Sequence, residues 1–178
     1  MNPYSIIEKY YPEGKLRDIL IIHSELVRDK ALESLRHSGL SFDESLVGNG
    51  AMLHDIGIFL CDAPGIECHG TEPYIRHGLL GGEILRKDGY PELARFCERH
   101  TGAGLTAQDI ISQHLPLPPV DMLPETIEEK AVCYADKFYS KSGDITKEKS
   151  LSKVISSMAH HGEDTLNRFM ELHHLFGY

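Results

Sequence analysis

The feature that most constrains the fold of this chain is its apolar periodicity, which is helical along almost the whole length. Apolar residues recur three or four positions apart, as on one face of an α-helix, and no segment shows the convincing alternation of a β-strand. A length of 178 residues suits one domain. We therefore expect a single all-α domain over residues 1–178, with helices at about 3–10, 15–37, 41–55, 73–87, 91–101, 106–114, 125–142, 147–160 and 163–175.

Capping residues and prolines set several ends of these predicted helices. Ser41 with Glu44, and Thr106 with Asp109, have the spacing of a capping box, in which two side chains satisfy free backbone N–H groups at a helix start. Residues 115–124 contain four prolines and are expected to form an extended connection.

The charge balance narrows the range of partners. The chain has 18 Lys and Arg against 27 Asp and Glu, a formal net charge of −9, so nothing along the sequence as a whole attracts nucleic-acid polymers or anionic membranes. The apolar run at 19–22 is far shorter than the ~20 residues that span a bilayer, and residues 1–13 lack the pattern of a signal peptide. We therefore expect a cytoplasmic protein without a membrane or nucleic-acid polymer as partner. The four cysteines form no CxxC pair and are expected to be free thiols, some of them buried.

Histidine is unusually frequent, with 11 in 178 residues, and imidazole is the commonest metal ligand in proteins. His23, His77, His100 and Asp136 each interrupt the apolar stripe of a predicted helix. A single histidine in that setting is more often a hydrogen-bonded core residue. A buried carboxylate such as that of Asp136 is harder to explain, because burial without a partner is costly.

The pair His54-Asp55 is the sharpest local signal. Neighbouring helical residues point about 100° apart, so both side chains reach one point only at a helix end, which Gly57 favours. A carboxylate there can bind a hard metal ion while the imidazole takes a neighbouring position. Alone, such a pair is more often a surface pair or a cap at a helix C-terminus. Together with the four interrupted stripes it indicates a metal centre where five helices converge.

Glycines inside two predicted helices leave two alternatives open. Gly48 and Gly50 lie in one helix, and Gly78, Gly81 and Gly82 lie in another. Each costs about 1 kcal/mol relative to alanine in a helix interior. Either these helices bend or fray, or their backbones approach a neighbour closely.

The pattern of these residues resembles the HD-domain superfamily, which is named for its His-Asp pair. The stretch His77 to Leu85 is similar to the H-x-x-x-G-x-x-I-L stretch of HD-GYP-like members. The residues that match the metal ligands of binuclear members are, in chain order, His23, His54, Asp55, His77, His100 and Asp136. The resemblance covers about residues 15–145 and implies an HD-type helical bundle around a metal site, to which helices at about 147–175 are added.

The resemblance also implies roles for the six residues. Asp55 would be the catalytic residue that bridges two metal ions. The first ion would be completed by His23, His54 and Asp136, and the second by His77 and His100. Mixed imidazole and carboxylate ligands suit iron or manganese, and the sequence does not choose between them.

Other polar residues near these positions are candidates for contact with a substrate. A phosphate would need cations close to the metals, and the candidates are Lys137, which adjoins Asp136, together with Arg99 and Lys141. His69 lies in a predicted loop that would cover the site. Ile58 occupies the position after HDIG where many HD-GYP-like members have lysine, which argues against a cyclic-di-GMP phosphodiesterase.

These features together predict a metal-dependent phosphohydrolase that uses a binuclear centre on a small nucleotide or another phosphate ester. Two other functions remain open because the resemblance reaches them as well. One is a mixed-valent di-iron oxygenase with the same ligands, and the other is a non-catalytic module that senses nucleotides. The sequence predicts neither the exact substrate nor the oligomeric state.

Overall fold

The computed structural model describes residues 1–177, and most of them are helical, as the periodicity predicts. None of the helices in this range has the length and apolar character needed to cross a membrane. The elements, in which η denotes a 3-10 helix, are α1 (Pro3–Tyr10), α2 (Lys15–Ser38), α3 (Glu44–Leu53), η1 (Ile58–Leu60), β1 (Asp62–Ala63), η2 (Pro64–Ile66), β2 (Cys68–His69), η3 (Tyr74–Arg76), α4 (His77–Lys87), α5 (Pro91–Glu98), α6 (Ala107–Ser112), α7 (Ile127–Asp136), α8 (Leu151–His160) and α9 (Glu163–Phe176).

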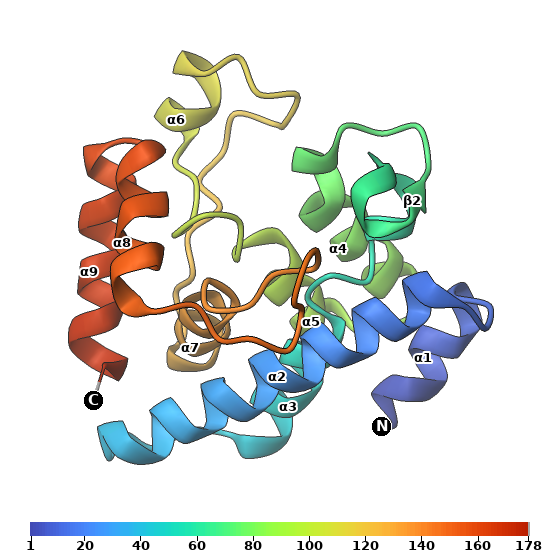
Figure 1. Ribbon diagram of the computed structural model, residues 1–178, viewed down its shortest axis with the longest axis horizontal. Helices are drawn as coiled ribbons and strands as arrows, with labels where there is room; N and C mark the ends of the chain where they lie inside the picture. The colour runs from blue at the N-terminus through green and yellow to red at the C-terminus, as the bar shows by residue number, and fades with distance from the viewer. Residues whose placement is uncertain (178) are drawn as a thin grey trace.

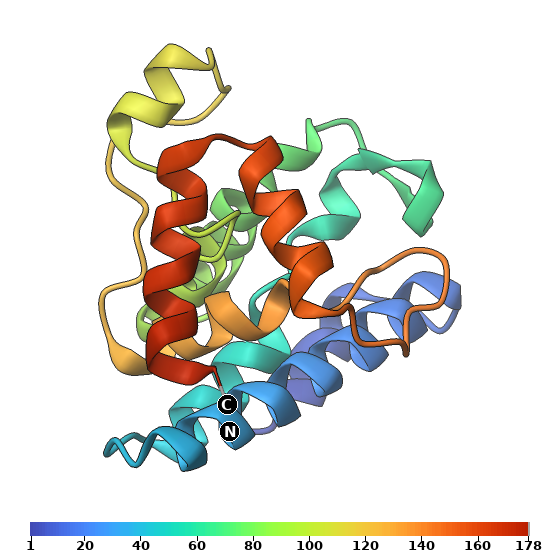
Figure 2. The ribbon, with the colours of Figure 1, turned by 60° about the vertical axis from the view of Figure 1, so that its left-hand side comes forward.

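The long helix α2 forms one edge of the molecule and packs against both α3 and α7 (Figure 1). Helix α4 packs against α5, and α5 in turn contacts α3 and α7. Helix α9 packs against α7 and α2, and α8 packs against α9, so α7 lies in the interior. Helix α6 stands out from this body on a long excursion of the chain between α5 and α7 (Figure 2).

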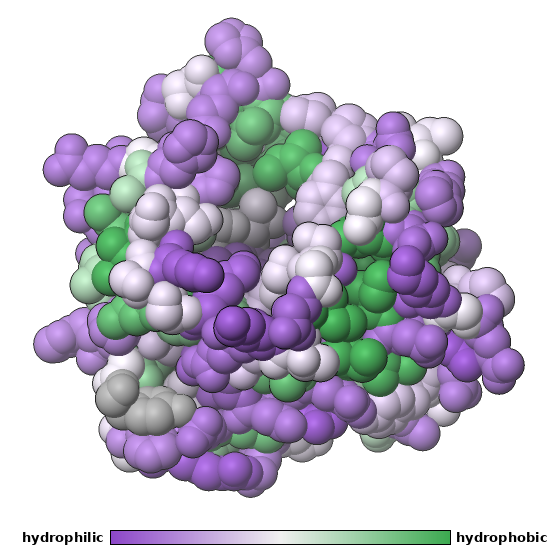
Figure 3. Space-filling view, viewed as in Figure 1, coloured by the Kyte–Doolittle hydropathy of each residue, from purple (hydrophilic) through white to green (hydrophobic). Residues whose placement is uncertain are grey.

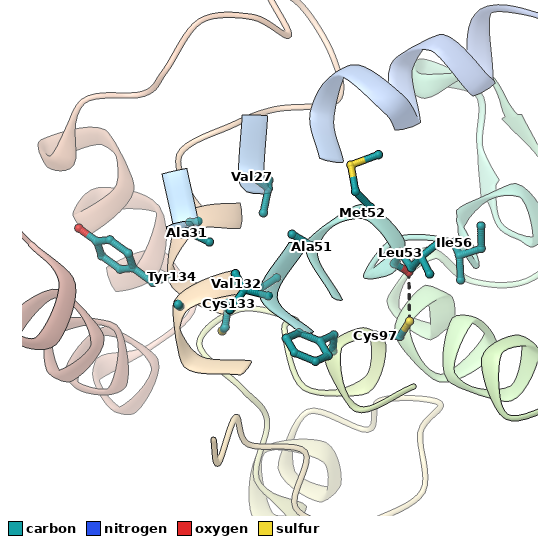
Figure 4. Packing of buried hydrophobic residues seen from close by; sticks show 14 of the residues in the cluster. Val27, Ala31, Ala51, Met52, Leu53, Ile56, Cys97, Val132, Cys133 and Tyr134 are labelled. Atoms are coloured by element: carbon teal, nitrogen blue, oxygen red, sulfur yellow. Dashed lines mark hydrogen bonds between the residues drawn. The ribbon is translucent and has the colours of Figure 1, made fainter. Parts of the chain in front are cut away.

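Apolar side chains of α2, α3, α5 and α7 fill the space between these helices (Figure 4). Val27 and Ala31 of α2 face Ala51 of α3 and Val132 of α7, and all four are fully buried. The thiol of Cys97 donates to the carbonyl oxygen of Leu53 at 3.2 Å, which joins α5 to the end of α3. The four cysteines are free and buried, as predicted.

The glycines resolve the two alternatives in favour of close approach at several positions. A Cβ on Gly78 would lie 2.3 Å from the carbonyl oxygen of Cys97, so α4 and α5 meet there backbone to backbone. A Cβ on Gly57 would lie 2.3 Å from the carbonyl oxygen of His77. Gly48 faces open space and has no such role.

Most predicted helices are present, but some begin or end at residues other than those predicted. The Thr106–Asp109 capping box is confirmed. The capping box predicted at Ser41 is wrong, because the side chain of Asp43 accepts the bond from the backbone N–H of Leu46 and the helix begins at Glu44.

Two other differences concern the segments around the predicted site. The helix predicted at 125–142 ends at Asp136, and the helix predicted from 73 begins with the 3-10 turn η3 before α4. A two-stranded antiparallel pair, which the periodicity did not predict, joins β1 to β2 by pairing Asp62 with His69 and Ala63 with Cys68. Strands of two residues are too short to show an alternating pattern in the sequence.

Candidate metal centre

Helix ends converge on one buried point of the molecule. His54 and Asp55 directly follow α3, His100 comes two residues after α5, and Asp136 is the last residue of α7. The C-terminal end of a helix carries partial negative charge from its free carbonyl groups and favours cations. Three such ends therefore add to the two carboxylates in attracting positive charge. His77 opens α4, and His23 lies within α2.

The first cluster consists of four side chains that offer two imidazole nitrogens and two carboxylate oxygens. Nε2 of His23 lies 3.0 Å from Oδ1 of Asp136 and 3.3 Å from Oδ2 of Asp55. Nε2 of His54 lies 3.2 Å from the same Asp55 oxygen and 3.4 Å from the same Asp136 oxygen. One donor atom from each side chain thus surrounds a common point, with all four atoms within 4.8 Å of one another.

The second cluster uses the other oxygen of the same carboxylate. Oδ1 of Asp55 lies 3.4 Å from Nε2 of His77 and 3.4 Å from Nε2 of His100. The two imidazole nitrogens are 3.0 Å apart. Two His/Asp clusters therefore share Asp55, with one carboxylate oxygen turned toward each.

Backbone carbonyl groups fix the orientation of three of the imidazole rings. Nδ1 of His54 lies 2.6 Å from the carbonyl oxygen of Ala51, and Nδ1 of His77 lies 2.7 Å from that of Tyr74. Nδ1 of His100 is likewise 3.0 Å from the carbonyl oxygen of Phe96. A carbonyl oxygen can only accept, so these Nδ1 atoms carry hydrogen and Nε2 is the ring atom turned toward the cluster.

The electrostatics of the clusters favour ionised carboxylates. Burial by itself raises the pKa of Asp55, but the charges of Lys141 and His54 hold it well below its usual range. The pKa of Asp136 is also well below its usual range, because Lys137 and Lys141 outweigh the effect of burial.

The imidazoles of the two clusters differ in charge. Burial lowers the pKa of His54, but the charge of Asp55 and the bond to Asp136 outweigh it and raise that pKa to about 9. In the second cluster burial dominates and lowers the pKa of His77 to about 3. Burial lowers the pKa of His100 in the same direction. The second cluster thus offers neutral imidazoles, the form that binds metals.

The donor set fits metal ions. Both carboxylate oxygens of Asp55 and Nε2 of His54 are buried, and no described residue gives them a hydrogen bond of full geometry. Nε2 of His77 and Nε2 of His100 face each other as two lone pairs, an arrangement that a cation between them would satisfy. Imidazole and carboxylate donors together suit divalent transition metals.

Two lysines flank the clusters on the side of Asp136. Nζ of Lys137 lies 2.7 Å from Oδ2 of Asp136 and donates to the carbonyl oxygen of His100 at 2.9 Å. It therefore holds the outer oxygen of Asp136 and turns Oδ1 toward the first cluster. Nζ of Lys141 lies 2.5 Å from Oδ2 of Asp55.

The structure places the other two substrate candidates away from the clusters. Arg99 donates to the carbonyl oxygen of Leu123 and to Glu125, although it is next to His100 in the chain. His69 lies on β2 with an exposed side chain whose nearest charged partner is Glu67. Neither residue lines the cavity that borders the first cluster, described next.

A cavity of about 400 Å³ opens beside Asp136. We call it the lysine-lined cavity, after Lys137, Lys141 and Lys149, and its wall also includes Tyr74 and Ser157. The sequence analysis missed Lys149, Tyr74 and Ser157. A compositional signal was present for Lys149, because five of the ten lysines fall between residues 137 and 153.

The fold and the two clusters define a helical domain with a candidate binuclear metal site. A family model described as the HD domain matches residues 20–140, so the chain belongs to the HD-domain family. This confirms the resemblance inferred from the sequence, including the all-α fold. The roles of the individual ligands remain predictions that the geometry of the clusters supports.

Three relatives are similar over most of the chain. An uncharacterized protein of Methanocaldococcus jannaschii is 41% identical over 133 residues, which are 74% of this chain and 70% of that protein. The tRNA (cytidine(56)-2'-O)-methyltransferases of Picrophilus torridus and Thermoplasma volcanium are 35% and 34% identical over 88% of this chain. The match spans only 41% of each methyltransferase. No solved structure matches the chain significantly.

Proposed function

We propose that this chain is a metal-dependent phosphohydrolase that acts on a small phosphate ester such as a nucleotide. The observation that carries the proposal is the direct contact between the paired clusters and the lysine-lined cavity. Asp136 belongs to the first cluster and also lines that cavity, where Lys137, Lys141 and Lys149 gather. Although the chain has a net charge of −9, three lysines line this one cavity.

Lys149 is the cation best suited to bind a phosphate oxygen. In the described part of the chain, its ammonium group bonds only to carbonyl oxygens, those of Lys137 at 3.4 Å and Tyr139 at 3.3 Å. Burial is the main cause that lowers its pKa, Lys137 and Lys141 lower it further, and the charge of Asp136 compensates only in part. An anion in the cavity would add to that compensation.

The other groups of the site would hold the metal ions and orient the ligands. The two clusters would each hold one metal ion, of iron or manganese, and these ions would bind phosphate oxygens and activate water. Asp55 places one carboxylate oxygen in each cluster and thereby sets the spacing between them. Lys137 orients Asp136, and Lys141 lies at the boundary between Asp55 and the cavity.

The relatives do not replace this proposal. Two of the three are named as tRNA methyltransferases, but the match covers less than half of each of them. We therefore propose a small phosphorylated molecule as the substrate, with no nucleic-acid polymer and no membrane as partner.

Phosphate release under exclusion of oxygen tests the function. The manganese-loaded chain is expected to release phosphate from at least one member of a panel of nucleotides and simple phosphate esters. Lys149→Gln is expected to lower kcat/KM by about tenfold to 150-fold, the effect of one charge-assisted hydrogen bond, and to keep its metal. The matched control Lys87→Gln, on an exposed residue at the end of α4, should not change kcat/KM.

Two results would replace the proposal with one of the other functions. Turnover that requires iron and O₂, with no phosphate released from any tested compound, would identify an oxygenase. Nucleotide binding without any turnover would identify a sensing module.

A further inference from the structure

A second cavity, of about 330 Å³, shares no lining residue with the lysine-lined cavity. We call it the Leu105 cavity; its lining includes Ile75, Leu105, Gln113 and Leu115. In Figure 3, hydrophobic atoms coloured green lie just below α6, at the upper edge of the central hollow. The proposed phosphohydrolase function makes no use of this cavity.

Two residues that line the Leu105 cavity are chain neighbours of residues at the second cluster, although no ligand of that cluster lines the cavity itself. Thr101 lines it and directly follows His100. Ile75 also lines it and follows Tyr74, whose ring stacks on that of His77 with centroids 4.6 Å apart. The cavity therefore lies near the second cluster, and a molecule with its phosphate at the clusters would enter it beside these two residues.

The lining of this cavity suits a flat ring with polar edges. Ile75, Leu105 and Leu115 offer apolar surfaces to the faces of a ring. The side-chain amide of Gln113, an exposed residue at the edge of the cavity, has both a donor and an acceptor that can bond to a ligand. A volume of about 330 Å³ falls at the lower end of the range typical of small-ligand sites.

We propose that the Leu105 cavity binds the heteroaromatic base of a nucleotide whose phosphate lies at the metal clusters and the lysine-lined cavity. The proposal rests on the proposed phosphohydrolase function and adds to it the class of substrate and the place of its base. Gln113 reads the polar edge of the base, and Leu115 covers its face.

Kinetics on substrates with and without a base test the inference. The manganese-loaded full chain is assayed with the four ribonucleoside 5'-monophosphates and with methyl phosphate, which lacks a base. At least one nucleotide is expected to have a KM about tenfold or more below that of methyl phosphate, because apolar burial and one hydrogen bond add to its binding.

Two variants and one control locate the base. Gln113→Leu should raise the KM for the preferred nucleotide by about three- to tenfold, the effect of one hydrogen bond. Leu115→Trp should fill the cavity and raise this KM further. Neither variant should change the kinetics with methyl phosphate. Gln108→Leu, the same substitution on an exposed residue of α6 outside the cavity, should change nothing. If Leu115→Trp does not fold, Gln113→Leu alone decides.

The outcomes separate this inference from the function on which it rests. If phosphate is released but the cavity variants affect nucleotides and methyl phosphate equally, the base site is refuted and the hydrolase stands. If nothing is hydrolysed, calorimetric binding of the same nucleotides decides: weaker binding in Gln113→Leu with unchanged binding in Gln108→Leu supports the base site. Equal binding in both variants, or no binding to the wild type, overturns it.

Discussion

Replacing His100 by alanine is expected to remove one metal ion and leave the other. Nε2 of His100 faces Oδ1 of Asp55 and Nε2 of His77, whereas the first cluster uses none of its atoms. The variant keeps all four donors of the first cluster and two of the three donors of the second. The metal content should therefore fall from two ions per chain to one.

Thermal unfolding gives the expected size of the effect. A site filled at a free metal concentration about 1,000 times its Kd stabilises the folded chain by about 4 kcal/mol. For a chain of this size, 1 kcal/mol raises the midpoint by about 2–4 °C, so each such site should add about 8–16 °C. Metal should thus raise the midpoint of His100→Ala by about half the wild-type shift.

The measurements are elemental analysis after removal of unbound metal and calorimetric scans with and without manganese. His160→Ala, on an exposed histidine at the end of α8, is the matched control and should keep two ions and the full shift. Two ions per chain in His100→Ala, or none, would refute the division of donors between two sites that share one carboxylate.

Three further perturbations test other parts of the centre. Lys137→Gln should weaken metal binding at the first cluster by about 10- to 100-fold, because Asp136 loses the bond that orients it; unchanged affinity in a metal titration would contradict this. The apparent metal affinity of the same cluster should tighten by up to about tenfold per pH unit as the pH rises toward about 9, because metal must displace the proton that His54 holds below its raised pKa; a flat profile between pH 6 and 8 would argue against it. Gly57→Ala should destabilise the fold by about 1–3 kcal/mol, because its Cβ would meet the backbone of His77; a denaturation midpoint equal to that of the wild type would refute the close approach.

The six residues that form the clusters were predictable because each breaks a local rule. A polar side chain on an apolar helical stripe, or a His-Asp pair before a glycine, is visible in the sequence without any knowledge of tertiary contacts. The structure brings these same residues together. Several of them lie at or just after the C-terminal ends of α3, α5 and α7, which explains why neighbours such as His54 and Asp55 can face one point.

The residues around the clusters were less predictable, because their placement depends on how loops return. Arg99 is next to His100 but turns to Glu125 instead. Lys149 lies 13 positions beyond Asp136, after a loop without periodicity, yet it reaches the same cavity. The end of α7 at Asp136 was also missed, because apolar residues such as Phe138 continue past it.

The segment that carries α6 can change in sequence without altering the candidate metal ligands. Residues 101–126 lie between His100 and the start of α7, and they supply none of the six candidate ligands. Arg168 of α9 holds this segment in place through the side chain of Asp109 and the carbonyl oxygen of Gly104. Insertions or substitutions here can therefore reshape the Leu105 cavity while the ligand framework keeps its geometry. A laboratory selection for altered substrate preference should for that reason accumulate its mutations in this segment rather than in the helices that carry the histidines.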